Sequence, residues 1–228
     1  MRESIIWACA LLGAVLSSVA QSAVIIDFET DFNNDPIVAG QVIDTEFTHL
    51  GVSLVTAENY RFGHPDLAAI FDSSNPTGGD DDLQTPGVHP TNTVAYGNIL
   101  IIPESGDNDN DGIIDDPDDE KANPAGWIDF ALSGVYTGFK AIMIDTEEPT
   151  GTVDFYLGGL FQGSVPLPAV DDNEVYMVTY NQTPYDQFRF NFAGSGGIAQ
   201  IELIPEPASI ALLAFGAMPL LLRRRQSA

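Results

Sequence analysis

Apolar and polar residues alternate with a period of two over many short segments from residue 24 onward. In residues 186–192, Phe188, Phe190 and Phe192 alternate with polar residues, which is typical of a strand with one face in a core. The same alternation, or a short apolar run between Gly, Pro, Asn and Asp residues, predicts ten further strands. They lie at residues 24–28, 52–56, 68–71, 98–102, 128–132, 139–144, 153–157, 160–165, 175–180 and 199–204.

These segments predict an all-β fold. No segment of residues 24–204 keeps the helical period of 3.6 long enough to predict a helix. Short strands separated by frequent turn signals favour a two-sheet antiparallel sandwich, jelly-roll-like, with a closed barrel as the alternative. Two long connections interrupt the pattern, at residues 72–93 and 106–120. A connection as long as residues 72–93 is usually either functional or disordered.

The predicted sandwich domain, residues 24–204, lies between two apolar segments. Residues 1–23 have Arg2, an apolar run and then small residues, which is the pattern of a secretory signal peptide with a helical core. Near the other end, residues 208–222 are apolar, and as a helix they would span roughly 22 Å of a hydrocarbon core about 30 Å thick. We therefore expect an exported domain that is only transiently attached to the inner membrane, against the alternative of a permanent anchor at either end.

Charge and cysteine content narrow the function further. The chain has 33 acidic and 8 basic residues, for a net charge of −25, so nucleic acid and anionic lipid are excluded as natural partners and cations are favoured. Cys9, the single cysteine, lies in the predicted signal, so the exported domain has no disulfide. A metal ion is then the cross-link available to it.

The segment of residues 106–120 predicts a calcium-binding loop. It reads GDNDNDGIIDDPDDE, in which oxygen-bearing side chains alternate and a glycine permits the sharp turn. The predicted ligands are Asp107, Asp109, Asp111, the backbone carbonyl of Ile113, Asp115 and Asp118. No helical pattern flanks the loop and position twelve is Asp118, not Glu, so the loop resembles those of dockerins and thrombospondin type 3 repeats. A solvated acidic linker is the alternative.

A second cation site is a weaker expectation at Asp80, Asp81 and Asp82, with Asp27 or Asp72 as an added ligand. Three consecutive side chains cannot all face one ion, so a solvated loop is the favoured alternative there.

The C-terminal segment has three parts in a fixed order. Pro205, Glu206 and Pro207 are followed by the apolar run and then by the basic cluster Arg223, Arg224 and Arg225. This tail resembles the PEP-CTERM sorting signal of Gram-negative, biofilm-forming bacteria. The resemblance implies recognition by the membrane protease exosortase and a place at the cell surface or in the extracellular matrix, with exopolysaccharide as a possible partner. Residues 26–29, 70–74, 79–83 and 191–196 are similar, more loosely, to secreted domains that precede such tails.

The residues of common active sites do not form recognisable patterns. His49, His64 and His89 are scattered without the spacing of a zinc site, and are expected to be surface or loop histidines. Ser195 lies in a glycine turn that lacks the G-x-S-x-G pattern. We therefore expect a non-enzymatic calcium-binding protein of the surface or matrix. The alternative is a carbohydrate-binding module, in which Trp127 is the candidate platform for a sugar ring unless it only covers a sheet edge.

Overall fold

The computed structural model describes residues 22–206 of the chain, which form ten strands and two short 3-10 helices. The predicted signal helix, the C-terminal apolar helix, Pro207 and the three arginines lie outside the described residues. The 3-10 helices are η1 (Thr48–Leu50) and η2 (Asp81–Leu83). The strands are β1 (Val24–Ile26), β2 (Val52–Asn59), β3 (Ala69–Asp72), β4 (Asn98–Ile101), β5 (Gly126–Ile144), β6 (Thr152–Leu157), β7 (Leu160–Pro166), β8 (Val175–Tyr180), β9 (Tyr185–Phe192) and β10 (Gly197–Pro205).

The long strand β5 joins the two halves of the fold. The sequence predicts separate strands at residues 128–132 and 139–144, but the structure makes them one continuous strand. The first half of β5 pairs with β2 and β9, and the second half pairs with β8 and β10. The register shifts between Ala131 and Tyr136, where residues 133–135 are exposed. Alternation is lost at these exposed residues, which is why the sequence divides the strand in two.

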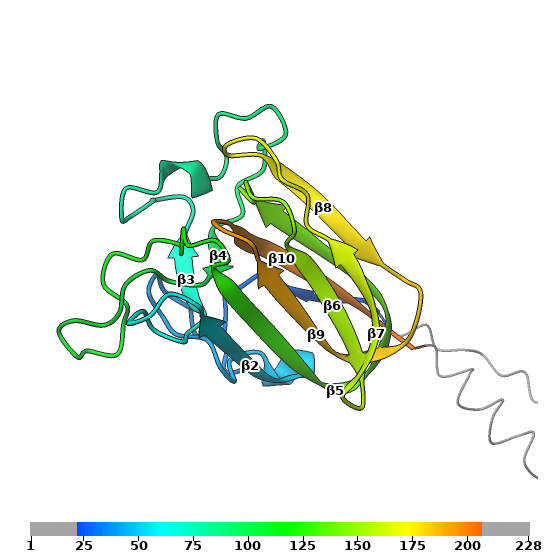
Figure 1. Cartoon of the computed structure of the whole chain (residues 1–228). Helices are drawn as coiled ribbons and strands as arrows, with labels where there is room; N and C mark the ends of the chain where they lie inside the picture. Colours follow the sequence, from blue (N-terminus) through cyan, green and yellow to red (C-terminus); the bar gives the residue numbers. More distant parts are fainter. Residues whose placement is uncertain (1–21, 207–228) are drawn as a thin grey trace, which may run out of the picture. The chain divides into compact units, whose positions relative to one another are not determined.

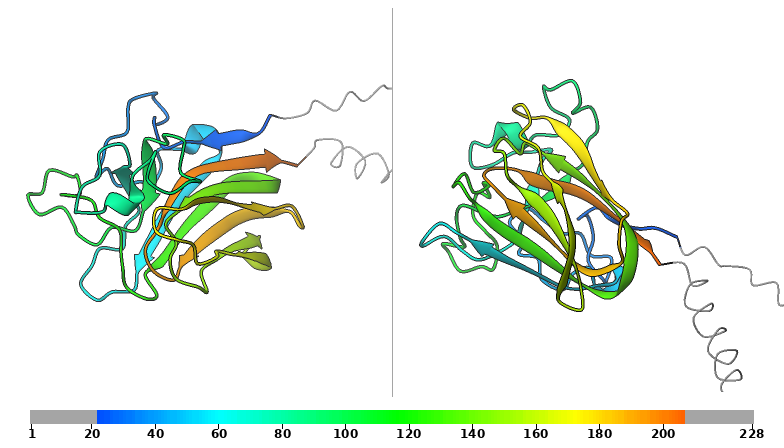
Figure 2. Two further views of the ribbon diagram at one scale, coloured as in Figure 1. Left: turned by 90° about the horizontal axis from the view of Figure 1, so that it is seen from above. Right: turned by 45° about the vertical axis from the view of Figure 1, so that its right-hand side comes forward.

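The strands form two layers (Figures 1 and 2). One layer has the order β2-β5-β9-β6-β7, and the other contains β8, β5 and β10, with β1 and the β4-β3 pair beyond β10. All pairings between these strands are antiparallel. The path of paired strands ends at β3 and β7, so among residues 22–206 it does not close into a barrel. The structure thus confirms the predicted all-β antiparallel sandwich.

Aromatic side chains fill the space between the layers. Phe139, on the second half of β5, lies 5.0 Å from Phe155 of β6 and 5.1 Å from Phe188 of β9, measured between ring centroids. The ring of Phe155 also stacks on Tyr180 of β8 at 3.9 Å. The predicted inward residue Phe190 is fully buried, as Phe188 is. Each such ring contributes about 1.5–3 kcal/mol by its burial, which holds the layers together.

Long loops gather at one end of the sandwich, at the left and upper left of Figure 1. The β3–β4 connection is not a free loop, because its side chains are bound at both ends. Near its start, Ser73 Oγ hydrogen-bonds Thr85 Oγ1 at 2.5 Å. Further on, Asn92 Nδ2 donates to the Gln84 carbonyl at 2.8 Å and to Asn173 Oδ1 at 3.0 Å. A connection of this length is usually either functional or disordered, and these hydrogen bonds show that this one is ordered.

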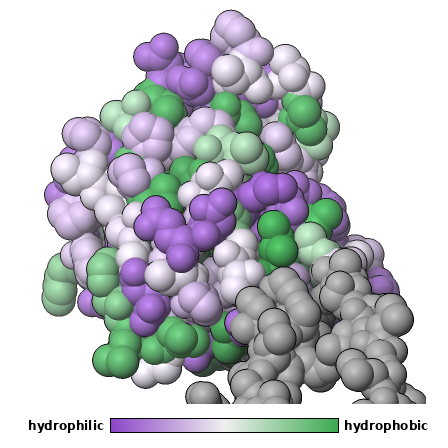
Figure 3. Space-filling view, turned by 90° about the vertical axis from the view of Figure 1, so that its right-hand side faces the viewer, coloured by the Kyte–Doolittle hydropathy of each residue, from purple (hydrophilic) through white to green (hydrophobic). Residues whose placement is uncertain are grey.

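The outer surface of the domain is mixed in character. The face in Figure 3 has apolar side chains scattered between hydrophilic ones. The two most exposed large apolar residues of β7 are Leu160 and Phe161, with 71% and 60% of their surface exposed. Within the described part of the chain, no helix is both long and apolar enough to cross a membrane.

Candidate metal centre

Six aspartates from four connections meet at the loop end of the sandwich, in what we call the buried acidic centre. They form two groups, and within each group one carboxylate oxygen per residue lies within 4.8 Å of the others. The inner group is Asp80, Asp118 and Asp119, and the outer group is Asp82, Asp145 and Asp172.

Asp119 is positioned by an extension of β4. The Glu104 N–H donates to the Asp118 carbonyl at 2.8 Å, and the Glu120 N–H donates to the Ile102 carbonyl at 2.9 Å, so residues 117–120 pair with the chain after β4. Successive side chains of a paired extended segment face opposite sides. Asp119 accordingly points into the centre, while Glu120 points toward Asn59, to which it is hydrogen-bonded at 3.1 Å. Asp118 departs from this alternation and brings a carboxylate oxygen to the same group from its edge.

The helix η2 distributes the three consecutive aspartates to different places. Asp80 precedes the helix and accepts a long 3.5 Å hydrogen bond from the Asp119 N–H. Asp82 lies in the outer group, and Asp81 between them is exposed. The three side chains therefore do not converge on one point, and the expected solvated loop is wrong for Asp80, which is 2% exposed.

Asp145 and Asp172 come from the other side of the centre. Asp145 directly follows β5, with a left-handed backbone at φ 57°, and its Oδ1 accepts the Asn173 N–H at 2.6 Å. Its Oδ2 accepts the hydroxyl of Ser195 at 3.2 Å. Asp172 is exposed, beside a pocket of about 470 Å³ that is also lined by Asp82. The outer group is thus open to solvent on one side.

Burial makes the ionised form of these carboxyls unfavourable. Asp80, Asp119 and Asp145 are each at most 2% exposed. Burial, assisted by the neighbouring carboxylates, raises the pKa of Asp80 to about 10 and that of Asp145 to about 7. The pKa of Asp119 is also raised well above its ordinary value, mainly by burial. The basic group Lys121 contacts the centre at its edge, with Nζ 3.5 Å from Asp118 Oδ1 and half of its side chain exposed.

Three buried carboxylate oxygens in the centre have no hydrogen-bond partner. Asp119 Oδ2 accepts the Gly196 N–H, but Asp119 Oδ1 contacts no donor. Asp82 Oδ1 and Asp118 Oδ1 have no hydrogen-bond partner either, although Lys121 Nζ lies 3.5 Å from the latter. A buried carboxylate without a partner costs several kcal/mol. Because every group that converges here offers oxygen, the arrangement suits a hard divalent cation such as calcium.

The predicted calcium loop forms a second, more exposed cluster. Asp107, Asp109 and Asp115 each place an oxygen within 4.8 Å of the others. Asp107 also accepts backbone N–H groups of Gly112 at 2.8 Å and Asn110 at 2.6 Å, and these bonds, that of Gly112 first, lower its pKa.

The remaining predicted ligands of this loop lie elsewhere. Asp111 does not join the three grouped carboxylates, and its Oδ1 accepts the Ile113 N–H at 2.9 Å. Asp118 lies in the buried acidic centre, not in the loop cluster. The twelve-residue spacing therefore assigned Asp118 to the wrong group, because residues 117–120 turn back to pair with the chain after β4.

The expected partners of the Asp80 to Asp82 segment also differ from those in the structure. Asp27 accepts the Glu29 N–H and Asp72 the Ser74 N–H, both within their own turns. The actual neighbours, Asp119, Asp145 and Asp172, were missed by the sequence analysis. They come from three connections far apart in the chain, so no local spacing indicates them. One available signal was that Asp145 directly follows a buried strand.

Trp127 lies on the outer face of β5 and is partly buried. Its indole N–H donates to Glu58 Oε2 at 2.8 Å, and the Arg189 guanidinium lies 4.0 Å from the ring centroid. One face of the ring is therefore already in a cation–π contact. At the far end of the sandwich, Pro205 ends β10 opposite Tyr136, and the Glu206 N–H donates to the Val135 carbonyl at 3.3 Å.

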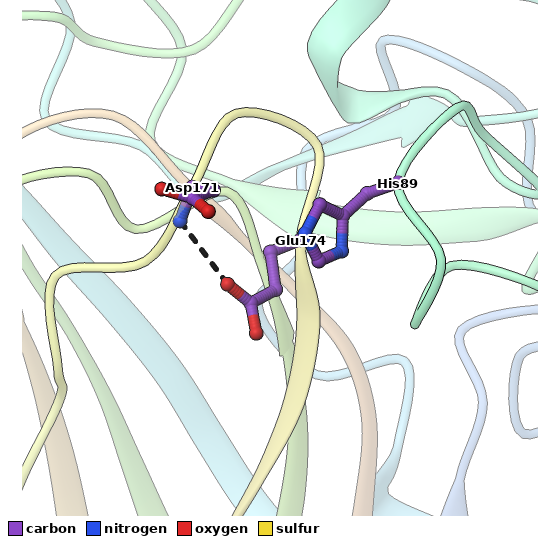
Figure 4. Close-up of side chains that lie close together, drawn as sticks. All are labelled: His89, Asp171 and Glu174. Atoms are coloured by element: carbon purple, nitrogen blue, oxygen red, sulfur yellow. Dashed lines mark hydrogen bonds between the residues drawn. The ribbon is translucent and has the colours of Figure 1, made fainter.

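Two histidines have specific partners. His64 was expected at the surface or in a loop, and it lies in the loop after β2, where its side chain is 19% exposed and its Nδ1 lies 2.7 Å from Glu120 Oε2. His89 lies beside Asp171 and Glu174 at the tips of two loops, where the Asp171 N–H donates to Glu174 at 3.1 Å (Figure 4).

Comparison with known proteins gives little beyond the fold. No protein-family model matches the chain, and no curated protein matches it. Among solved structures, it is similar to a carbohydrate-binding module, CBM6cm-2 from Cellvibrio mixtus lichenase 5A, in complex with cellotriose. The identity is 11%, the match covers 48% of this chain and 79% of that chain, and the TM-score is 0.27. At that TM-score the similarity carries no argument about what this chain binds.

Proposed function

We propose that the chain is an exported, non-enzymatic calcium-binding protein of the cell surface or extracellular matrix. The observation that carries the proposal is Asp119, which is 1% exposed and has a carboxylate oxygen without any partner, between Asp80 and Asp118. A calcium ion would supply the missing interaction and offset the repulsion between carboxylates. At an effective dielectric of 20, two such charges 5 Å apart repel by roughly 3 kcal/mol.

The side chains that most often activate nucleophiles have structural partners, which favours a non-enzymatic role. His64 is engaged by Glu120, and His89 Nδ1 lies 3.0 Å from Thr91 Oγ1. Ser195 Oγ is directed at Asp145, within the buried acidic centre. A nucleophile needs a base that is free to take its proton, whereas Asp145, the base within reach of Ser195, is here assigned to the proposed ion-binding centre.

Calorimetry on the full chain in mild detergent, after treatment with a chelator, tests the proposal. We expect calcium binding at micromolar to millimolar affinity, as is usual for extracellular modules. Asp119→Asn should weaken it by at least about tenfold, equivalent to roughly 1.4 kcal/mol, because an anionic ligand is lost while the shape is kept. Asp81→Asn is the matched control, since Asp81 is exposed between two ligands. Equal affinity in wild type and Asp119→Asn contradicts the proposal.

A second candidate function is binding of exopolysaccharide on the outer face of the first layer. Beside Trp127, this face has a band of polar side chains, in which Asp129 accepts bonds from Gln187 and Arg189, all at 2.9 Å, and Asn191 donates to Asp154 at 2.9 Å. An aromatic ring next to such donors and acceptors suits a sugar. Retention on matrix polysaccharide that is lost in Trp127→Ala supports this function, and unchanged retention removes Trp127 from it.

The tail provides the argument for export and for exosortase as a partner. Its motif begins at Pro205, the last residue of β10, so a sorting protease would meet it directly after the folded domain. Mass spectrometry of the protein from its native host should give a mature chain that lacks both ends. A full-length chain in the cytosol would contradict export.

A further inference from the structure

Charge in the buried acidic centre exceeds what one divalent cation can balance. Its six carboxylates carry six negative charges when ionised, and the nearby basic group Lys121 contributes one positive charge at the edge. One calcium ion together with Lys121 leaves three negative charges uncompensated, whereas two ions leave one. Three of the six carboxylates, Asp80, Asp119 and Asp145, are buried, and an uncompensated charge on any of these costs several kcal/mol. The charge balance thus favours two ions.

The geometry provides two sets of ligands that adjoin each other. Asp80 of the inner group and Asp82 of the outer group are two residues apart around η2. On the other side, the consecutive residues Ser195 and Gly196 bind Asp145 of the outer group and Asp119 of the inner group. Asp119 interacts electrostatically with Asp118 in its own group and with Asp82 and Asp145 in the outer group. Its unpartnered Oδ1 is therefore in a region that both groups surround.

We propose that the buried acidic centre binds two calcium ions side by side. Asp80, Asp118 and Asp119 hold the inner ion, Asp82, Asp145 and Asp172 hold the outer ion, and Asp119 lies between the two. This inference rests on the proposed calcium-binding function and adds the number of ions and the ligands of each. The pair fastens the β3–β4, β4–β5, β5–β6 and β7–β8 connections to one another, because each connection contributes at least one ligand.

The two ions differ in their access to solvent. Two of the three inner ligands, Asp80 and Asp119, are buried. The outer group includes the exposed Asp172 and adjoins the pocket of about 470 Å³. The outer ion therefore retains coordination positions for water, exchanges faster and is removed first by a chelator.

Counting ions by native mass spectrometry tests this inference on the full chain. The background is Asp107→Asn/Asp109→Asn, which removes the exposed loop as a source of bound calcium. Two calcium ions per chain are expected in this background, lost in two separate steps as chelator is added. One ion, lost in a single step, overturns the two-ion inference but leaves the proposed function in place. No bound ion overturns both.

Substitutions in the same background then assign the ions. Asp145→Asn/Asp172→Asn should reduce the count from two to one and remove the fast-exchanging ion. Asp80→Asn/Asp118→Asn should remove the slow one. Asp81→Asn/Asp171→Asn, at two exposed neighbouring positions, is the control and should retain both ions. If either centre variant fails to fold, the count in the background chain still decides between one ion and two. A count of two that survives both centre variants places the ions elsewhere and overturns the assignment.

Discussion

His64 Nδ1 lies 2.7 Å from Glu120 Oε2, in a polar pocket on the opposite side of residues 117–120 from Asp119. The Glu120 side chain is fully buried and also accepts hydrogen bonds from Asn59 at 3.1 Å and from the Ala122 N–H at 2.8 Å. On the side away from the centre, Glu120 thus holds residues 117–120 in place, and this segment directs Asp119 into the centre.

Glu120→Gln should therefore lower stability and weaken calcium binding together. Weakening the hydrogen bonds that the buried Glu120 carboxylate accepts costs about 1.5–3 kcal/mol, and the freed segment would hold Asp119 less firmly. Urea unfolding in saturating calcium measures the first effect and calorimetry the second. Asp116→Asn, an exposed change four residues away, should alter neither. Unchanged unfolding in Glu120→Gln would show that the pair contributes no stability.

Calcium should stabilise the protein more at pH 8 than at pH 5. The raised pKa values of Asp80, about 10, and Asp145, about 7, mean that the metal-free fold retains protons that the unfolded chain loses near its value of 3.8. Metal-free stability therefore falls as the pH rises above about 4 and continues to fall until each folded pKa is passed. The charged groups that face these carboxyls are Asp82, Asp118, Asp119, Glu147 and Lys121.

Melting curves with calcium and with EGTA at the two pH values measure this effect. The increase in melting temperature caused by calcium should be larger at pH 8 by more than about 5 °C, since 1 kcal/mol corresponds to 2–4 °C for a domain of this size. An increase that is the same at both pH values would mean that calcium does not replace protons on buried carboxyls.

The exposed calcium loop should be separable from the buried acidic centre. Asp107→Asn/Asp109→Asn should leave the free energy of unfolding within about 0.5–1 kcal/mol of wild type, because these side chains are at the surface. Cleavage next to Ile113 by a protease that prefers apolar residues should be slow in calcium for wild type and fast for the variant, since neither substitution alters that cleavage site. Equal cleavage rates would indicate that the loop binds no calcium.

The contact between the layers predicts a large effect of one core residue. Phe155→Ala removes a ring that touches Phe139 and Tyr180, and should cost about 3–5 kcal/mol. Leu160→Ala, three residues beyond β6 and 71% exposed, should cost less than about 0.5 kcal/mol. Chemical denaturation measures the free energy of unfolding of both variants. Similar losses of stability in the two variants would contradict the two-layer core.

Gly126 is required by a close approach of two strands. A Cβ at this position would lie 2.0 Å from the Glu58 carbonyl oxygen, so Gly126→Ala should displace β2 from β5 at a cost of about 3 kcal/mol. In the same strand, Gly134→Ala would meet Tyr136 at an ordinary 3.9 Å and should be nearly neutral. Thermal unfolding of the two variants compares these outcomes.

The pattern along the chain predicted the strands well because each has one buried face, and Phe188 and Phe190 lie as the period of two requires. The pattern divided β5 into two predicted strands because residues 133–135, between its two halves, are all exposed and do not alternate. It also located the acidic loop, in which the grouped carboxylates of Asp107, Asp109 and Asp115 are close together in sequence.

The buried acidic centre could not be predicted in the same way. Asp80, Asp119 and Asp145 are brought together by the pairing of residues 117–120 with the chain after β4 and by the end of β5. Such contacts follow from the tertiary fold, and composition makes every acidic residue an equal candidate. The acidic composition indicated only that cations are favoured.

Strand β10 begins next to Gly196, which binds Asp119, and ends at Pro205, so its nine residues separate the aspartates from the exit of the chain by roughly 30 Å. β1 pairs with the last part of β10, with Val24 opposite Leu203, so the chain also enters at that distant end (Figure 2). Attachment through either terminus would consequently hold the end where β1 begins and β10 ends near the point of attachment. The opposite end, which carries the buried acidic centre, would then face away from the anchoring surface.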